Sequence, residues 1–338
     1  MGFLTGCRVI QVRVKVADGS SVSSRAGVRS PRLLPMVDRV LVTLDGAVQD
    51  PDAPLLSADD FGALRGDGVF ETVLVREGKP CALELHLARL RRSAQILDLP
   101  EPDLGQWRST VEIAAKEWGA EREGQLRMVL TRGRESDGPA SRVTSGVLSE
   151  TPDSTAYVLV VAVPERVNKA RTEGVSVITL ARGISVDLAQ SAPWLLMGAK
   201  SLSYATNMSA LRFAARQDAD DVIFTSTEHR VLEGPRSTVV IQRDKQLLTP
   251  PAKHGVLPGI TQRALFAEAE RAGWKCEYKS FFVADLITAE SVWMLGSITL
   301  AARVASLDGL RMSAPDCAPE ISELVDRGVA RSWQLADW

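Results

Sequence analysis

Short apolar runs, bounded by glycine and charged residues, follow one another along the chain from Met36 onward. They predict strands over residues 40–44, 68–75, 126–131, 156–163, 175–180, 221–224, 230–232, 238–241, 275–280, 291–295 and 301–304. Apolar residues at helical spacing predict helices over 85–97, 103–118, 200–216 and 261–272, with a short helical turn near Asp285. Because strands come in runs with few helices between them, the predicted fold is mixed α+β rather than a doubly wound sheet.

Two segments interrupt this pattern. Residues 133–153 are rich in Ser, Gly, Asp and Pro, which predicts a loop. The segment that begins after Pro164 predicts a linker over 165–172. We therefore expect a smaller α/β N-terminal domain, 36–164, and a larger C-terminal domain, 173–338.

Residues 1–35 have a different composition, with several basic side chains and Asp18 as the one acid. A leader rich in Arg and Ser and poor in acids is typical of a transit peptide. The alternative is that translation begins at Met36 and that the leader is a disordered tail or no part of the native protein. We favour the alternative.

Composition and charge narrow the class of protein. The chain has 338 residues, 45% of them hydrophobic and 24% charged, which suits one large or two medium globular domains. A net charge of −2 does not favour nucleic acid or an anionic membrane as a partner, and no apolar run approaches the ~20 residues of a membrane span. Four scattered cysteines suit a reducing cytoplasm, and His86, His229 and His254 lack metal-ligand spacing, so we expect no bound metal.

Three motifs in the second half of the chain carry candidate chemistry. Lys200 lies among small residues, Glu233 follows in a Glu-Gly turn, and Gly259-Ile260-Thr261 opens a helix. A lysine can form a Schiff base, a carboxylate can pair with a ring nitrogen, and the free N–H groups of a helix N-terminus can bind phosphate. This combination indicates a pyridoxal 5'-phosphate site, although each residue alone also fits a surface lysine or an ordinary turn.

In this order, the motifs resemble the class IV aminotransferase family of fold-type IV pyridoxal-phosphate enzymes, from about Met36 to about Leu310. The family includes D-amino acid and branched-chain aminotransferases and 4-amino-4-deoxychorismate lyase. The resemblance implies a small α/β N-terminal domain and a larger C-terminal pseudo-barrel, with the cofactor between them, and usually a homodimer.

The resemblance also implies roles for single residues. Lys200 matches the Schiff-base lysine, although Ser203 stands where asparagine is common, and Glu233 matches the carboxylate that faces the pyridine nitrogen. Tyr204 matches a donor to the phenolic oxygen of the cofactor, or else a core residue. The remaining cofactor-binding positions are Arg89, Ile260, Thr261, Ser237, Thr238 and Ser297, with Thr299 as the alternative to Ser297. Arg236 departs from the small residues common in the family, so we expect its side chain to point in an unusual direction.

Residues on the predicted strands 68–75 and 126–131 indicate which member of the family the chain resembles in its substrate. Phe70 and Leu74 replace the tyrosine and lysine that D-amino acid aminotransferases tend to carry, and the second strand resembles that of the lyase. Candidate residues for substrate carboxylates are Arg127, Arg132 and Arg134, with cross-strand salt bridges as the alternative.

The first hypothesis is therefore a 4-amino-4-deoxychorismate lyase, which forms 4-aminobenzoate and pyruvate for folate synthesis. The second is an aminotransferase for D-amino or branched-chain amino acids. A third is a pyridoxal-phosphate-binding protein without catalysis, against which the intact Lys200, Glu233 and Arg89 count.

Overall fold

A computed structural model of the chain describes residues 38–137 and 154–331. The predicted leader and most of the predicted loop over 133–153 lie outside these residues. The first sheet has six strands in the order β2-β1-β6-β5-β3-β4, and every neighbouring pair is antiparallel. Its members are β1 (Arg39–Thr43), β2 (Val48–Gln49), β3 (Gly68–Arg76), β4 (Lys79–Pro80), β5 (Gly124–Thr131) and β6 (Ala156–Ala162).

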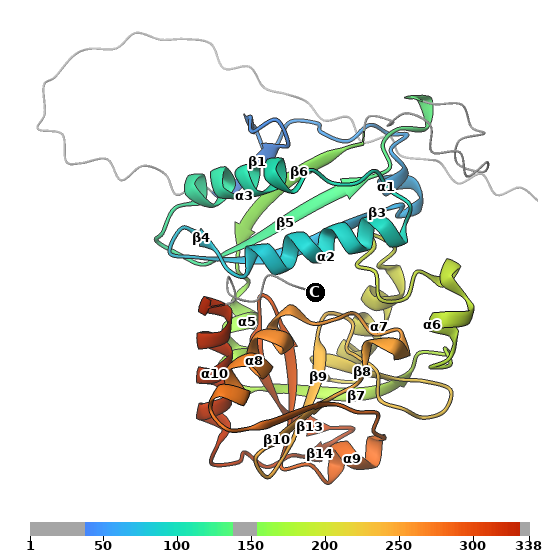
Figure 1. The fold of residues 1–338 in the computed structure, drawn as a ribbon, viewed down its shortest axis with the longest axis vertical. Helices are drawn as coiled ribbons and strands as arrows, with labels where there is room; N and C mark the ends of the chain where they lie inside the picture. Colours follow the sequence, from blue (N-terminus) through green and yellow to red (C-terminus); the bar gives the residue numbers. More distant parts are fainter. Residues whose placement is uncertain (1–37, 138–153, 332–338) are drawn as a thin grey trace, which may run out of the picture. The chain divides into compact units, whose positions relative to one another are not determined.

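Two helices, α2 (Leu83–Ile96) and α3 (Leu104–Trp118), cover one face of this sheet (Figure 1). The Asp103 side chain accepts hydrogen bonds from the N–H groups of Gly105 and Gln106, which caps α3. Leu87 and Leu90 of α2 pack with Val69 and Val73 of β3 in one apolar core. Alternate residues of β3 thus face the helices, and the residues between them face the second half of the chain. A short helix, α1 (Phe61–Arg65), precedes β3.

The second sheet has the order β11-β10-β9-β12-β13-β7-β8, with β14 paired to β13. Parallel and antiparallel pairs are mixed within it. Its members are β7 (Val175–Ala181), β8 (Asp221–Thr225), β9 (Thr238–Arg243), β10 (Gln246–Thr249), β11 (Lys275–Tyr278), β12 (Ser291–Gly296), β13 (Leu300–Leu307) and β14 (Leu310–Arg311). Together with the helices, the two sheets confirm the predicted mixed α+β class.

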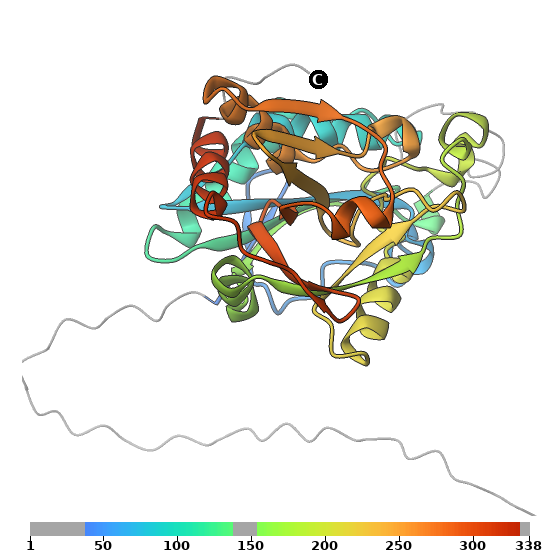
Figure 2. The same cartoon turned by 90° about the horizontal axis from the view of Figure 1, so that it is seen from below.

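Two helices of the C-terminal part, α8 (Ile260–Arg271) and α10 (Ala318–Arg331), pack side by side (Figures 1 and 2). A Cβ atom at Gly328 would lie 2.4 Å from the Ala264 carbonyl oxygen, so the close approach of the helices depends on a glycine at that position. The other α-helices of this part are α5 (Glu165–Glu173), α6 (Leu188–Ser191), α7 (Ala205–Ala215) and α9 (Val283–Ile287).

The segment around Lys200 joins the two sheets. Phe70 N–H donates to the Lys200 carbonyl oxygen at 3.0 Å, and Leu202 N–H donates to the Gly68 oxygen at 2.8 Å. These bonds hold Lys200 in an extended segment against β3. The predicted helix over 200–216 was therefore wrong at its start, and α7 begins at Ala205 because the peptide groups before it are paired with a strand.

Two other predicted segments have a secondary structure that the sequence did not indicate. The predicted linker over 165–172 is the helix α5, which Pro164 precedes and Gly174 ends with a φ of 86°. The predicted strand over 230–232 is not regular. Arg230 and Val231 form isolated bridges, to Phe282 and Thr225, because the segment pairs with a different neighbour at each of these residues. The domain limits taken from the sequence stay a prediction.

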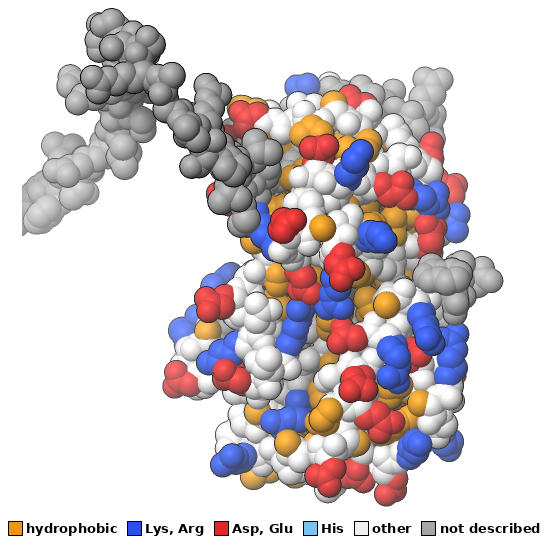
Figure 3. Space-filling model, turned by 90° about the vertical axis from the view of Figure 1, so that its left-hand side faces the viewer, with side chains coloured by type: hydrophobic (Ala, Val, Ile, Leu, Met, Phe, Trp, Pro, Cys, Tyr) orange, Lys and Arg blue, Asp and Glu red, His pale blue; other side chains and the backbone are white. Residues whose placement is uncertain are grey.

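Basic and acidic side chains are interspersed on the face of the molecule drawn in Figure 3. Among the helices within 38–137 and 154–331, none combines the length and the apolarity that crossing a membrane requires.

Candidate functional site

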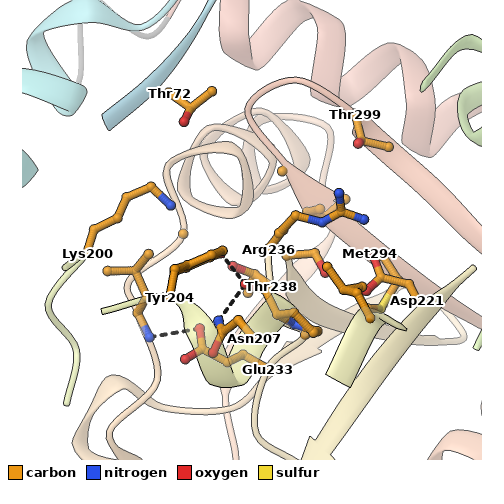
Figure 4. A pocket seen from close by; sticks show the side chains of 18 of the residues that line it. Thr72, Lys200, Tyr204, Asn207, Asp221, Glu233, Arg236, Thr238, Met294 and Thr299 are labelled. Carbon is orange, nitrogen blue, oxygen red and sulfur yellow. Dashed lines mark hydrogen bonds between the residues drawn. The ribbon is translucent and has the colours of Figure 1, made fainter. Parts of the chain in front are cut away.

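A cavity of about 870 Å³ lies between the first sheet and the C-terminal part of the chain (Figure 4). From the first sheet, β3 contributes Phe70 and Thr72, and β5 contributes Gln125 and Arg127. The structure brings these predicted residues to the same cavity: Lys200, Glu233, Arg89, Tyr204, Ser237, Thr238, Ile260, Thr261, Ser297, Thr299, Phe70 and Arg127.

Lys200 is held at its backbone and half-buried at its side chain. Its N–H donates to the Ser93 hydroxyl of α2 at 3.1 Å. Its Nζ lies 4.5 Å from the centroid of the Phe70 ring, which meets the Tyr204 ring edge-on at 5.4 Å. Burial, and next the charge of Arg89, lower the pKa of the Lys200 amine to about 8. A lysine in this setting has a substantial neutral fraction near physiological pH, as a nucleophile requires.

Glu233 lies between β8 and β9 at the base of the cavity. Its Oε2 accepts a hydrogen bond from Leu257 N–H at 3.0 Å. Burial raises the pKa of the carboxyl to about 7, although this hydrogen bond and the charges of Arg182 and Lys200 act in the opposite direction. A carboxylate with such a pKa would gain strongly from a cationic group placed beside it.

Arg89 belongs to a buried group of three side chains, together with Glu71 and His86. The Arg89 guanidinium donates to both Glu71 oxygens, at 2.7 and 2.8 Å, and to the Pro258 carbonyl oxygen at 2.8 Å. Burial acts to raise the pKa of Glu71, but the charge and hydrogen bonds of Arg89 outweigh it and hold that pKa well below its usual range. Burial lowers the pKa of His86, whose Nδ1 lies 2.7 Å from Glu71. Because an ionised Glu71 only accepts, His86 Nδ1 carries the proton.

The N-terminus of α8 faces the cavity with unused donors. Gly259 precedes the helix without a capping side chain, and within the described residues the N–H groups of Ile260 and Thr261 have no protein acceptor. Ser237, which lines the same cavity, has a buried Oγ with no hydrogen-bond partner among the described residues. The arrangement fits a phosphate or another oxyanion. A Cβ at Gly259 would lie 2.2 Å from Thr238 Oγ1, so a larger residue would displace Thr238 from this position.

Tyr204 has a partner other than the predicted one. Its hydroxyl donates to the Pro235 carbonyl oxygen, which also accepts from Asn207 Nδ2 at 2.7 Å. Burial raises the pKa of Tyr204 to about 12, so the hydroxyl keeps its proton. That one proton is directed at the backbone here, and the donation from Tyr204 to a cofactor oxygen stays a prediction.

The three arginines predicted to bind substrate lie in two different places. Arg127 lines the cavity, opposite Thr72 in the β3–β5 register. Arg132 donates to both oxygens of Asp67, at 2.7 and 3.1 Å, and to two backbone carbonyls. Arg134 pairs with Asp59 at 3.4 Å. Neither Arg132 nor Arg134 lines the cavity, so the alternative of structural salt bridges describes both.

Several site residues were missed by the sequence analysis. Glu71 and Ser93 hold Arg89 and Lys200, and Asn207 holds the turn after Glu233. One signal was available: Glu71 interrupts the apolar positions Val69 and Val73 on one face of β3, which indicates a buried and therefore paired carboxylate. The partners themselves depend on the packing of α2 and α7.

Comparisons with known proteins find a family profile and several relatives. The family profile described as amino-transferase class IV matches residues 68–307. The chain is 50% identical, over 86% of its length and 99% of the relative, to the bifunctional aminodeoxychorismate lyase / D-amino acid transaminase of Mycobacterium tuberculosis.

Solved structures of a hypothetical aminotransferase from Mycobacterium tuberculosis are also 50% identical to this chain. The PLP-bound form has a TM-score of 0.80 and covers 86% of this chain and 98% of its own. The form bound to alpha-ketoglutarate and PMP has a TM-score of 0.81 and covers 86% of this chain and 99% of its own. The predicted fold type is therefore confirmed.

Proposed function

Because this chain belongs to the class IV aminotransferase family, a family of pyridoxal-phosphate enzymes, we propose that it is a 4-amino-4-deoxychorismate lyase that forms 4-aminobenzoate and pyruvate. We propose transamination of D-amino acids as a second activity of the same lysine. One observation carries the proposal: the Lys200 amine, with its pKa lowered to about 8, borders a cavity that also contains a carboxylate and an oxyanion-binding helix terminus.

The residues of the cavity fit pyridoxal phosphate. The unpartnered Ser237 hydroxyl and the free N–H groups at the start of α8 are suited to the phosphate, together with Thr238, Thr261, Ser297 and the guanidinium of Arg89. Glu233 would face the ring nitrogen, whose positive charge would keep this carboxyl ionised. When bound, the cofactor supplies an aldehyde for amine exchange and an electron-withdrawing ring that acidifies the carbon beside the substrate nitrogen.

Lys200 would act as the base of the lyase reaction. Its neutral amine removes the proton from the ring carbon that carries the substrate nitrogen. The bond to the enolpyruvyl oxygen then breaks, the ring becomes aromatic, and the released enolpyruvate gains a proton to become pyruvate. Phe70 and Tyr204 flank the amine, and the burial of the Lys200 side chain favours its neutral form.

The second activity needs the same base at a different carbon. In transamination, Lys200 would move a proton at the α-carbon of a D-amino acid, and an oxo acid such as 2-oxoglutarate would accept the amine. The bifunctional name of the relative at 50% identity supports this pairing of activities, as does the alpha-ketoglutarate in the solved structure.

We also expect the chain to form a homodimer, as the family resemblance implies. Large apolar side chains are exposed on and before α7: Trp194, Leu195, Met208 and Phe213. Exposed apolar groups of this size are typical of association surfaces. Light scattering on the purified protein would measure the mass, and a monomer at micromolar concentration would contradict the expectation.

The test uses the protein loaded with pyridoxal phosphate. Aminodeoxychorismate is added, and 4-aminobenzoate and pyruvate are followed together. Equimolar release, lost in Lys200→Ala and retained in the exposed-site control Lys245→Ala, is the expected result. Absence of release from protein that keeps the visible absorbance band of the cofactor would refute the lyase activity.

A second arm resolves the alternatives. D-Alanine and 2-oxoglutarate are supplied, and D-glutamate is measured. Transamination without lyase activity would make the protein a D-amino acid aminotransferase. Cofactor binding without either reaction would leave a non-catalytic binding protein.

A further inference from the structure

Arg236 lies in the turn between Glu233 and β9, and its side chain extends into the cavity (Figure 4). Gly234 N–H donates to the Ser237 oxygen at 2.8 Å, which closes the turn. The Pro235 carbonyl accepts from the side chains of Tyr204 and Asn207. The backbone on the N-terminal side of Arg236 is therefore held in place, which fixes the point at which its side chain leaves the turn.

A second arginine and two acids share this edge of the cavity: Arg166, Asp221 and Asp220, whose carboxylate accepts hydrogen bonds from Ser176. Burial, and next the charge of Arg236, lower the pKa of Arg166 at the start of α5. Burial raises the pKa of Asp221, while the charges of Arg236 and Arg166 oppose that rise. Within residues 38–137 and 154–331, no carboxylate lies within ion-pair distance of Arg166 or Arg236. Together with Lys169, three positive side chains thus stand against the two carboxyls of Asp220 and Asp221, and this edge of the cavity carries excess positive charge.

Two other arginines of the cavity have partners inside the protein. Glu71 binds Arg89 with two hydrogen bonds. Arg182 donates to Asn207 Oδ1 at 3.0 Å and lies 4.7 Å from the centroid of the Phe224 ring. Arg236, in contrast, is exposed to the cavity, and its guanidinium keeps its donors for a ligand.

We propose that Arg236, with Arg166 beside it, binds the substrate carboxylate that lies far from the reacting amine, and that it selects dicarboxylic over monocarboxylic substrates. The inference rests on the proposed function and names the substrate class of that site. A planar guanidinium fork matches a carboxylate in geometry and charge. Lys200 and Arg236 both line the cavity, and Figure 4 draws them on either side of Tyr204. The ring carboxylate of aminodeoxychorismate and the distal carboxylate of 2-oxoglutarate share this chemistry.

The test compares two amine acceptors on the same holoenzyme. Enzyme carrying the cofactor in its amine form is mixed with 2-oxoglutarate or with pyruvate, and the return of the aldehyde form is followed by absorbance. Arg236→Gln should lower kcat/KM for 2-oxoglutarate by about 10- to 100-fold, mainly through KM, because one charged hydrogen-bond pair is lost. The value for pyruvate should stay within about two-fold. Arg236→Lys should recover part of the loss, because the charge returns without the fork.

Lys169→Gln is the matched control, because Lys169 follows Arg166 on α5, lines the same cavity and carries the same charge. It should leave the preference between the two acceptors unchanged. Aminodeoxychorismate forms a third arm, in which Arg236→Gln should raise the KM for 4-aminobenzoate release. A lower kcat/KM for both 2-oxoglutarate and aminodeoxychorismate would support the selection of dicarboxylates, and a lower kcat/KM for aminodeoxychorismate alone would overturn it. Equal losses for 2-oxoglutarate and pyruvate would overturn the proposal.

The binding of carboxylates that cannot react tests the Arg236 site independently of the proposed function. Glutarate and butyrate are titrated into the holoenzyme by calorimetry. Glutarate should bind more tightly than butyrate, and Arg236→Gln should remove the difference. If the wild-type enzyme turns over no substrate yet shows this difference, the proposed function fails and the carboxylate site stands. If Arg236→Gln leaves glutarate binding unchanged, the site is absent whatever the activity.

Discussion

Arg89 donates two hydrogen bonds to Glu71, at 2.7 and 2.8 Å, and the two residues are 4% and 0% exposed. The same guanidinium reaches the Pro258 carbonyl in the segment before α8. The pair therefore ties β3, which carries Phe70, to the helix terminus that is suited to phosphate. Removing one partner of a buried ion pair is strongly destabilising, because the remaining charge is stabilised neither by water nor by an opposite charge.

Glu71→Gln should lower the free energy of unfolding by about 3–5 kcal/mol, because it leaves the charge of Arg89 buried without compensation. Urea unfolding of the apoprotein measures the change. Glu84→Gln is the matched control: Glu84 also binds an arginine, Arg108, with two bonds of 2.7 Å, but on the surface. Glu84→Gln should lower the free energy of unfolding by less than about 1 kcal/mol. Similar losses in the two variants would contradict the argument.

The pKa of Lys200 predicts how cofactor loading depends on pH. Only the neutral amine attacks an aldehyde, so the rate at which apoprotein combines with pyridoxal phosphate should rise with pH and reach half its maximum near pH 8. Stopped-flow absorbance measures the rate, and Lys200→Ala supplies the baseline. A midpoint above pH 10 would mean that the cavity does not perturb the lysine.

Glu233 should make the stability of the apoprotein depend on pH. Its pKa of about 7 in the folded protein lies above the ordinary 4.5, so the folded state holds a proton that the unfolded chain releases. The resulting stabilisation is complete below pH 4.5 and is lost as pH rises through 7. Between pH 4.5 and 8, wild-type apoprotein should lose up to about 3 kcal/mol relative to Glu233→Gln. Urea unfolding of both proteins across this range tests it, and parallel curves would exclude a raised pKa.

Gly234→Ala should damage the turn that holds Arg236. A Cβ there would lie 2.4 Å from Ser237 Oγ and 2.9 Å from the Val222 carbonyl oxygen, and the backbone oxygen cannot move aside cheaply. We expect a loss of about 1–3 kcal/mol in stability and weaker cofactor binding. Fluorescence titration with pyridoxal phosphate measures the second effect.

Gly105→Ala is the control for this substitution. Its nearest contact would be the Asp103 side chain at 3.2 Å, within helix α3. Stability should change by less than about 1 kcal/mol, with cofactor binding unaffected. A Gly234→Ala protein that behaves like this control would show that the turn can adapt.

Local patterns were sufficient for most of the secondary structure. The strand predicted over 68–75, the helix over 103–118 and the helix that opens at Gly259-Ile260-Thr261 all lie within one residue of where the sequence predicts them. Local signals failed where a segment is held by a distant one. Lys200 precedes α7 by several residues because its backbone pairs with β3, a contact between residues more than a hundred positions apart.

By itself the sequence determined the kind of fold and the chemically active residue types, because these follow from periodicity, from turn residues and from the order of Lys200, Glu233 and Gly259. Only the tertiary structure decided what each side chain contacts. It committed the Tyr204 proton to Pro235, paired Arg132 with Asp67, and left Arg236 facing the cavity without a carboxylate partner in the described chain. The physical reason is that burial and charge pairing depend on which segments meet in space, and no local pattern contains that information.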